Sequence, residues 1–257
     1  MIRVAAVGDI HMGPDSQGVL RPAFETLHEC ADLLLLAGDL TRHGTPEEMR
    51  VVAREVQDLA VPVVAVLGNH DHHDDRPDEV TAILRDAGAQ VLEGQSTVVE
   101  SGGTRIGVAG TKGFGGGFVG RCAGEFGEPV MKEFVQHSRR CADGLRTALE
   151  QLARDGCDAR IALTHYSPVP DTLAGEPLEI YPFLGSYLLA EAIDTAGADL
   201  AVHGHAHAGT EHGMTSGGVR VRNVAQPVIG RAFHVYHLPA RESAAVGAAA
   251  QGDRRLK

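Results

Sequence analysis

Three short apolar runs near the start of the chain each lead, through a glycine, to a polar residue. The runs are Ile2–Val7, Leu33–Ala37 and Val63–Leu67, and the polar residues are Asp9, Asp39 and Asn69. Continuous apolar runs of this length are typical of strands buried on both faces. Helical stretches over about residues 19–31 and 45–59 separate them, so we expect parallel strands joined by right-handed crossovers. Because ligands gather beyond the carboxyl ends of such strands, the pattern predicts an α/β fold with three polar side chains on one rim.

The remaining sequence continues this organisation. Thr45, Pro46 and the two acids that follow form a strong helix start. Further helices are predicted over about residues 78–87, 137–154 and 186–196. Strands are predicted over 91–92, 97–100, 105–109, 159–164 and 199–203, and closing antiparallel strands over 219–224 and 233–238. Residues 239–257 show no periodicity. We therefore expect one domain over residues 1–238 and a mobile tail over 239–257.

Composition limits the classes of function. The chain has 257 residues and a formal charge of −11, which fits one large domain and argues against nucleic acid and anionic lipid as partners. An anionic substrate would therefore need local cations. The four cysteines show no C-x-x-C spacing, which indicates reduced thiols of a cytoplasmic protein. No apolar run approaches the ~18 residues of a spanning helix, so no membrane association is expected.

Five short motifs supply seven candidate metal ligands. These are Asp9, His11, Asp39, Asn69, His165, His205 and His207. The set contains carboxylates, imidazoles and one amide but no thiolate, which favours Mn, Fe, Zn or Mg over Cu(I) or an iron–sulfur cluster. Within the first and last motifs the ligands are two residues apart, so their side chains can point the same way at a strand end. The alternative is a group of histidines that only hydrogen-bond to their neighbours.

In this order, the five motifs resemble the pattern of the calcineurin-like metallophosphoesterases, which reads D-x-H, G-D, G-N-H-[DE], H and G-H-x-H. The resemblance covers Asp9 to His207. It implies a two-sheet αββα sandwich with two divalent metal ions at the C-terminal rim of the strands. Asp39 would bridge the ions. The first ion would also be held by Asp9, His11 and His207, and the second by Asn69, His165 and His205.

The resemblance also assigns the chemistry. A hydroxide bridging the two ions would attack phosphorus in line, and His70 would protonate the leaving oxygen or stabilise charge on the phosphoryl group. A purely structural role is the alternative for His70. Asp71 is expected to support its loop, and His72 and His73 are expected to be solvated surface residues. His203 lies outside the family pattern and is expected to be a rim histidine that hydrogen-bonds to its neighbours.

The chain departs from the protein-phosphatase branch of this family. That branch continues G-D with x-x-D-R-G, whereas here Arg42 and His43 take the places of the acid and the arginine. Protein-phosphatase activity is therefore not expected, and the group that orients His70 is left open. The segment Gly38–Thr41, which reads G-D-L-T, instead resembles the corresponding motif of the bacterial phosphodiesterases of the family, including those that act on cyclic nucleotides. His43 and Lys112 are the candidate substrate-binding residues, with a solvated loop charge as the alternative for Lys112.

We therefore expect a metal-dependent phosphoesterase that acts on a small phosphate ester, preferably a diester. A phosphomonoesterase of the same family is the alternative within the reaction class. A non-catalytic scaffold is the alternative from another class, and the intact ligand set argues against it. A nuclease is a further alternative among enzymes, and the acidic charge argues against it. The long stretches 111–129 and 167–185 are expected to border the site. The glycines at 115–120 match G-x-G-x-x-G but do not open a helix after an N-terminal strand, so a dinucleotide site is not predicted.

Overall fold

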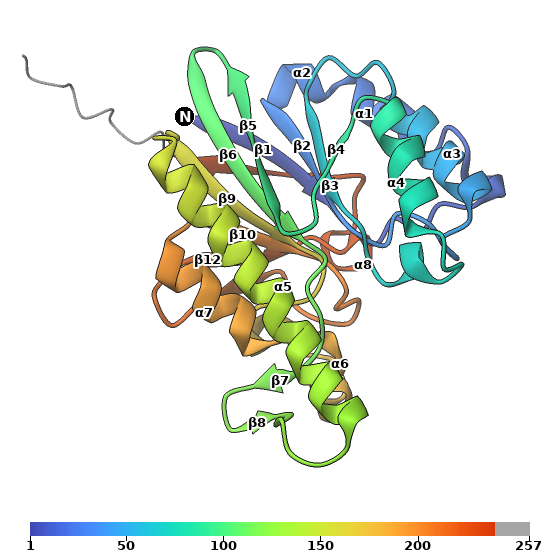
Figure 1. The fold of residues 1–257 in the computed structure, drawn as a ribbon. Coiled ribbons are helices and arrows are strands. Elements are labelled where there is room, and N and C mark those ends of the chain that lie inside the picture. Colours follow the sequence, from blue (N-terminus) through green and yellow to red (C-terminus); the bar gives the residue numbers. More distant parts are fainter. Residues whose placement is uncertain (240–257) are drawn as a thin grey trace, which may run out of the picture.

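Two β-sheets pack face to face in this computed structural model, which describes residues 1–239 (Figure 1). The five-stranded sheet has the order β13 (His234–Leu238), β1 (Ile2–Val7), β2 (Leu33–Ala37), β3 (Val63–Val66) and β4 (Gln90–Val91). The six-stranded sheet has the order β11 (His212–Met214), β12 (Arg220–Asn223), β10 (Leu200–His203), β9 (Ala159–Thr164), β6 (Thr104–Thr111) and β5 (Gln95–Ser101). The tail expected over residues 239–257 lies, apart from Pro239, outside the described residues.

Helices cover the outer face of each sheet (Figure 1). The first sheet is covered by α1 (Arg21–Glu25), α2 (Leu27–Cys30), α3 (Pro46–Val56) and α4 (Pro77–Asp86). The second is covered by α5 (Pro129–Arg154) and α7 (Tyr187–Ala196). Two shorter helices are α6 (Tyr181–Leu184) and α8 (Gln226–Ile229), and β7 (Gly117–Phe118) pairs with β8 (Arg121–Cys122) in a small hairpin. The predicted αββα sandwich is confirmed.

The apolar runs are continuous because each strand is buried on both faces. In β2, Leu34 and Leu36 pack against the covering helices, whereas Leu33 and Leu35 pack against the second sheet. All four side chains are fully buried. At about 1.5–3 kcal/mol for each fully buried leucine, these contacts make the layer between the sheets a major source of stability.

Strand directions agree with the prediction in the first sheet and differ in part in the second. β1, β2 and β3 are parallel, and β13 closes the sheet antiparallel to β1. β12 was predicted as an antiparallel closing strand; it does run antiparallel to β11, but it pairs with β10 in parallel. The reason is the short strand β11, which runs antiparallel to β12 and so reverses the chain a second time after β10.

Two helix predictions also need correction. α5 begins at Pro129, eight residues before the predicted start. The earlier turns could not be predicted, because they are exposed and lack an apolar stripe. The helix expected over 19–31 is divided into α1 and α2, which meet at Thr26. Helix α3 begins as predicted, with the Thr45 hydroxyl accepting from the Glu48 backbone N–H at 3.2 Å. Within residues 1–239, no helix combines the length and apolar character that crossing a bilayer requires.

The buried carboxylate of Glu55 ties α3 to the segment that follows the first ligand motif. It is 1% exposed and accepts hydrogen bonds from the backbone N–H groups of Gly18, Leu20 and Arg21. We expect Glu55→Ala to lower the free energy of unfolding by about 2–4 kcal/mol, because buried backbone donors lose their acceptor. Urea unfolding followed by circular dichroism measures this change.

Glu47→Ala is the matched control, since Glu47 lies on the same helix and is exposed. Its cost should stay below about 1 kcal/mol. Equal costs for the two variants would show that the Glu55 contacts contribute little.

Candidate metal centre

The site lies where the ends of both sheets meet. Asp9, Asp39 and Asn69 follow β1, β2 and β3 of the first sheet, and His165 and His205 follow β9 and β10 of the second. Parallel strands deliver their carboxyl ends to the same edge, so the two sheets place these side chains across a common seam. His205 links the ligand loops of the two sheets directly, because its backbone N–H donates to the Asp9 carboxylate at 2.9 Å.

The backbone is strained at four of the candidate ligands. Asp9, His11, Asp39 and His205 have φ values of 55°, 41°, 49° and 72°. Only two other non-glycine residues in the described part of the chain have positive φ, so this left-handed geometry is concentrated at the site. Each such residue costs of order 1–3 kcal/mol and persists only where its surroundings enforce it. The strain is therefore a feature of the ligand loops and not of loops in general.

The candidate donors form two adjoining groups. The first is Asp9, His11, Asp39 and His207, and the second is Asp39, His165 and His205. Within each group the ligand atoms all lie within 4.8 Å of one another, and Asp39 belongs to both. The Asn69 side-chain oxygen lies 2.9 Å from His165 Nε2, which adds it to the second group. The structure thus brings together all seven residues that the sequence nominated, with Asp39 at the centre.

Two glycines make room for the carboxylates. A Cβ atom on Gly68 would lie 2.1 Å from Asp39 Oδ1, and one on Gly204 would lie 2.2 Å from Asp9 Oδ2. Both distances are far shorter than any non-bonded contact. The glycines of G-N-H-D and G-H-A-H are therefore required by close approach of the carboxylates.

The charges of the site suit a cation. Burial would raise the pKa of Asp39, but the His165 imidazole and several hydrogen bonds hold it well below its ordinary value. Burial would likewise lower the pKa of His165, yet Asp39 raises it to about 9. Burial lowers the pKa of His205 to about 3, which leaves that ring neutral with a free lone pair. The Asp39 carboxylate and the neutral His205 ring are therefore ready donors for a divalent first-row ion, whereas His165 would have to lose a proton when such an ion binds.

His70 lies against the first donor group. Its ring is 4.6 Å from that of His11, and its Nε2 atom is 3.9 Å from Asp39 Oδ2. Its Nδ1 atom is 2.7 Å from the backbone carbonyl oxygen of Arg42, which can only accept, so Nδ1 carries a proton. This carbonyl is the orienting group that the sequence left open. It fixes the ring without adding the charge that a carboxylate would bring.

The side chain of Arg42 holds the first motif. Its guanidinium donates to the His11 carbonyl oxygen at 3.0 Å and to Ser16 at 3.1 Å, and it pairs with Asp15 at 2.7 Å. One residue therefore positions the D-x-H loop through its side chain and His70 through its backbone. Sequence reasoning missed this role, because the contact to His70 uses a backbone atom that any residue supplies.

Asp71 and His203 are structural. The Asp71 carboxylate is fully buried and accepts from the backbone N–H groups of Leu40, Thr41 and Gly68, which flank Asp39 and Asn69 in sequence. It supports the ligand loops, as predicted. His203 hydrogen-bonds to its neighbours, as expected, with its Nε2 2.8 Å from the Thr172 hydroxyl, and it is fully buried.

Four residues near the site differ in their exposure. His43 is exposed, and its Nδ1 lies 2.9 Å from the Glu48 carboxylate. Lys112 was weighed as a solvated loop charge, but its ammonium group is largely buried over the rings of Phe114 and Tyr166 at 5.0 and 5.4 Å. Solvation was also expected for His72, which was wrong: burial and Lys112 lower its pKa to about 4. His73 is exposed, as expected.

Both long stretches reach the site. The Lys112 carbonyl oxygen accepts from the backbone N–H groups of His165 and Tyr166 at 3.1 and 3.0 Å. The Phe183 carbonyl oxygen lies 3.3 Å from His205 Nε2. The segments 111–129 and 167–185 therefore border the second donor group.

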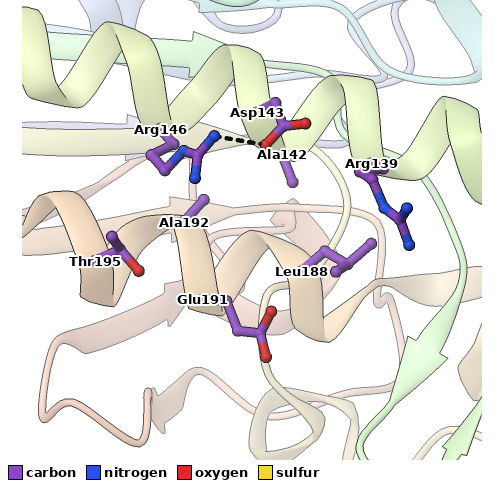
Figure 2. Close-up of a pocket in the computed structure, with 8 residues that line it drawn as sticks. All are labelled: Arg139, Ala142, Asp143, Arg146, Leu188, Glu191, Ala192 and Thr195. Atoms are coloured by element: carbon purple, nitrogen blue, oxygen red, sulfur yellow. Dashed lines mark hydrogen bonds and ion pairs between the residues drawn. The ribbon is translucent and has the colours of Figure 1, made fainter.

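A separate hollow of about 130 Å³ lies between α5 and α7 (Figure 2). Its charged side chains come from both helices, and Arg146 pairs there with Asp143 at 2.9 Å. It is lined by no residue of either donor group, and its charges are of both signs. We treat it as a surface feature of the helix layer.

An αββα sandwich with two adjoining carboxylate–imidazole groups at its strand ends is the architecture of a metallophosphoesterase. The model of the calcineurin-like phosphoesterase family matches residues 2–209, so the chain belongs to that family. Membership supports a hydrolase of phosphate esters.

Relatives of known description agree with this family. A protein of Synechococcus described as a probable cyclic nucleotide phosphodiesterase is 33% identical over 92 residues, which cover 32% of this chain and 34% of that protein. The chain thus matches about a third of that relative's length. The phosphopantetheinyl hydrolase of Mycobacterium tuberculosis has a similar fold, with a TM-score of 0.62 and 17% identity over 86% of this chain and 88% of that one. A protein of Thermus thermophilus gives a TM-score of 0.52 and 20% identity over 86% and 88%.

The close approach at the two glycines gives a direct test. We expect Gly68→Ala and Gly204→Ala each to displace a carboxylate and lower the metal content of the purified protein at least tenfold. Neither glycine has a positive φ, so the effect comes from the contact alone. Elemental analysis after dialysis against Mn²⁺ measures the bound metal.

Gly124→Ala is the control, because a Cβ at Gly124 meets no atom within 4 Å and its φ is ordinary. That variant should bind metal like the unmodified protein. Full metal content in Gly204→Ala would contradict the packing described for Asp9.

Proposed function

We propose that the chain hydrolyses small phosphate esters with two divalent metal ions and prefers diesters, cyclic nucleotides among them. The observation that carries the proposal is the sharing of Asp39 between two donor groups. A buried carboxylate with strained backbone and donors on both sides suits a bridge between two cations, and paired cations are suited to phosphoryl transfer.

Each donor group has a distinct part in this proposal. Asp9, His11 and His207 would hold one ion with Asp39, and Asn69, His165 and His205 would hold the other. When bound, the ions would supply Lewis acidity toward the phosphoryl oxygens and a water of lowered pKa as nucleophile. The oxygen and nitrogen donors suit Mn, Fe, Zn or Mg.

His70 is proposed to assist departure of the alcohol. Its side chain is 44% exposed, and its Nε2 faces the Asp39 carboxylate across 3.9 Å. The Arg42 carbonyl fixes the ring through Nδ1, so Nε2 is the atom left to meet a leaving oxygen. A positioned imidazole of this kind contributes about 10²–10⁴-fold as a general acid.

The proposed preference for diesters rests on which positively charged side chains near the site are free to bind phosphate oxygens. A monoester dianion gains from an additional arginine clamp. Arg42, the arginine next to the donor groups, is already engaged by Asp15, Ser16 and the His11 carbonyl oxygen. Lys112 is proposed to contact the substrate as a single point charge, and His43 to border the approach. The Synechococcus relative, described as a cyclic nucleotide phosphodiesterase, also favours a diester.

We propose a cytoplasmic location, which the spacing of the cysteines in the sequence favours. A phosphomonoesterase is the alternative reaction. A screen of Mn-loaded protein against mono- and diesters, with cyclic nucleotides included, distinguishes the two.

Removing the shared ligand should be the most damaging change to the metal centre. We expect Asp39→Ala to lose both ions and at least 10³-fold of the hydrolysis of bis(p-nitrophenyl) phosphate, because it removes contacts to both donor groups at once. Chelation of the unmodified protein should abolish turnover, and Mn²⁺ should restore it.

Asp86→Ala serves as the control, since Asp86 is exposed at the end of α4. An Asp39→Ala protein that kept two ions and most of its activity would refute the bridging role. Full activity in protein shown to be metal-free would refute the metal-dependent mechanism altogether.

The contribution of His70 to the rate of hydrolysis should depend on the leaving group. A nitrophenolate leaves without a proton, whereas an alkoxide needs one, so His70→Ala should cost about 10²–10⁴-fold on an alkyl or nucleotide diester and much less on an activated aryl diester. Metal content should be unchanged. The measurement is kcat/KM on both substrates.

His73→Ala is the control, because His73 is exposed and three residues away in the same loop. Equal losses on both esters would instead assign His70 to stabilising the phosphoryl charge. Loss on neither would make it structural.

A further inference from the structure

A series of aromatic rings leads away from the second donor group. The Tyr166 ring lies 4.3 Å from that of His205, and the Phe114 ring lies 5.7 Å from Tyr166. Phe114 in turn contacts Phe134 at 5.1 Å and His137 at 4.6 Å. The rings come from four places in the chain, so the fold and not the local sequence brings them into line.

The series ends in an open hollow of about 570 Å³. It is lined by Phe114, Pro129, Val130, Glu133, Phe134 and His137, which together we call the aromatic shelf. This volume is within the range of small-molecule sites, and the lining is mainly apolar with a few polar groups, which is typical of them. The shelf lies on the side of the molecule where β7, β8, α6 and the first turns of α5 gather (Figure 1).

Large apolar side chains around the shelf are left in contact with solvent. Val130 is 78% exposed, and Phe183, whose Cα would lie 3.2 Å from a Cβ on Gly115, is 61% exposed. The Phe183 carbonyl oxygen is the same atom that lies 3.3 Å from His205 Nε2. Phe183 therefore lies beside both the segment that carries Phe114 and the second donor group. Contiguous exposure of this kind marks a binding surface more often than a random surface feature.

Lys112 lies between the shelf and the donor groups and forms no salt bridge with a described residue. Its ammonium group contacts the Phe114 and Tyr166 rings and makes one long hydrogen bond, of 3.5 Å, to the Gly113 carbonyl oxygen. The nearby Glu93 carboxylate accepts instead from the Lys112 backbone N–H and the Thr111 hydroxyl. Among the described residues, Lys112 has no ion-pair partner, so it can meet an oxygen of a bound ester.

The shelf and His70 lie at opposite donor groups. The His70 ring contacts His11 of the first group, whereas the series of rings that leads to the shelf begins at His205 of the second. If His70 faces the leaving oxygen, the shelf faces the ester group that remains on phosphorus. The two organic groups of a diester therefore meet different surroundings.

We propose that the aromatic shelf binds the retained organic group of the substrate, and that this group is aromatic or otherwise flat and apolar. The inference rests on the proposed phosphodiesterase activity and adds to it the class of diester that is preferred. A ring on the shelf contacts Phe114 and Phe134, while Lys112 contacts an oxygen between that ring and phosphorus.

Two diesters with the same leaving group test the proposal. Phenyl p-nitrophenyl phosphate and methyl p-nitrophenyl phosphate both release nitrophenolate and differ only in the retained group. We expect Mn-loaded protein to favour the phenyl ester in kcat/KM by about tenfold after correction for the uncatalysed rates. Phe134→Ala and Val130→Asp should each reduce this preference about fivefold or more while retaining activity on the methyl ester.

Phe126→Ala is the matched control. Phe126 is 93% exposed in the same segment but does not line the shelf, so its loss should leave the preference unchanged. An unchanged preference in both shelf variants, or an equal reduction in Phe126→Ala, would overturn the proposal. Val130→Asp guards against a folding defect, because Val130 is largely exposed.

Binding without turnover separates this inference from the proposed function. Calorimetric titration with phenylphosphonate and methylphosphonate should show tighter binding of the phenyl compound, with the difference lost in Phe134→Ala and kept in Phe126→Ala. If the protein showed this difference in binding but hydrolysed neither diester, the shelf would still be a binding site and the proposed phosphodiesterase activity would be refuted. Activity on both diesters with no phenyl preference in rate or binding would refute the shelf alone.

Discussion

The carboxylate of Asp39 is the group around which the candidate site is organised. It is 1% exposed at the seam of the two sheets, accepts the His70 backbone N–H at 2.8 Å and lies 3.3 Å from His165 Nε2. Beneath it, Asp71 holds the backbone that flanks it, so one buried carboxylate secures the loops that position another. Burial and the charge of Asp39 raise the pKa of Asp71, which shows how much negative charge is concentrated here. Burying that much charge is costly unless cations offset it, and the proposed metals are the natural compensation.

Much of the fold could be predicted because each apolar run indicates both a buried strand and the position of the residues that follow it. The run of four leucines in β2 must be a strand buried on both faces, and Gly38 and Asp39 at its end must then lie at the edge of the sheet. The direction of β12 could not be deduced in this way, since it depends on β11, a strand of three residues without an apolar pattern. The start of α5 was missed for a related reason. Its first turns are solvent-exposed, and only Pro129 marks the beginning.

The ligand types could be predicted from the motifs, whereas their supports could not. Nothing in the sequence indicates that the carbonyl oxygen of Arg42 would orient His70, because every residue has a carbonyl group. The contact of Phe114 with Phe134 is equally hidden, since twenty residues and a hairpin separate the two rings. His72 looked like a member of a solvated run, and only the packing near Lys112 shows otherwise. What the sequence lacks is the surroundings of each side chain, which the tertiary structure alone supplies.

The hydrogen bond from the His205 backbone to Asp9 joins residues 196 positions apart. During synthesis, at about 5–20 residues per second, the Asp9 loop therefore emerges some 10–40 s before its partner exists. Both donor groups need residues from beyond β9, so neither can close around an ion until nearly the whole domain has been made. An ion held by either donor group therefore cannot assist the folding of the first half of the domain while the chain is still being synthesised.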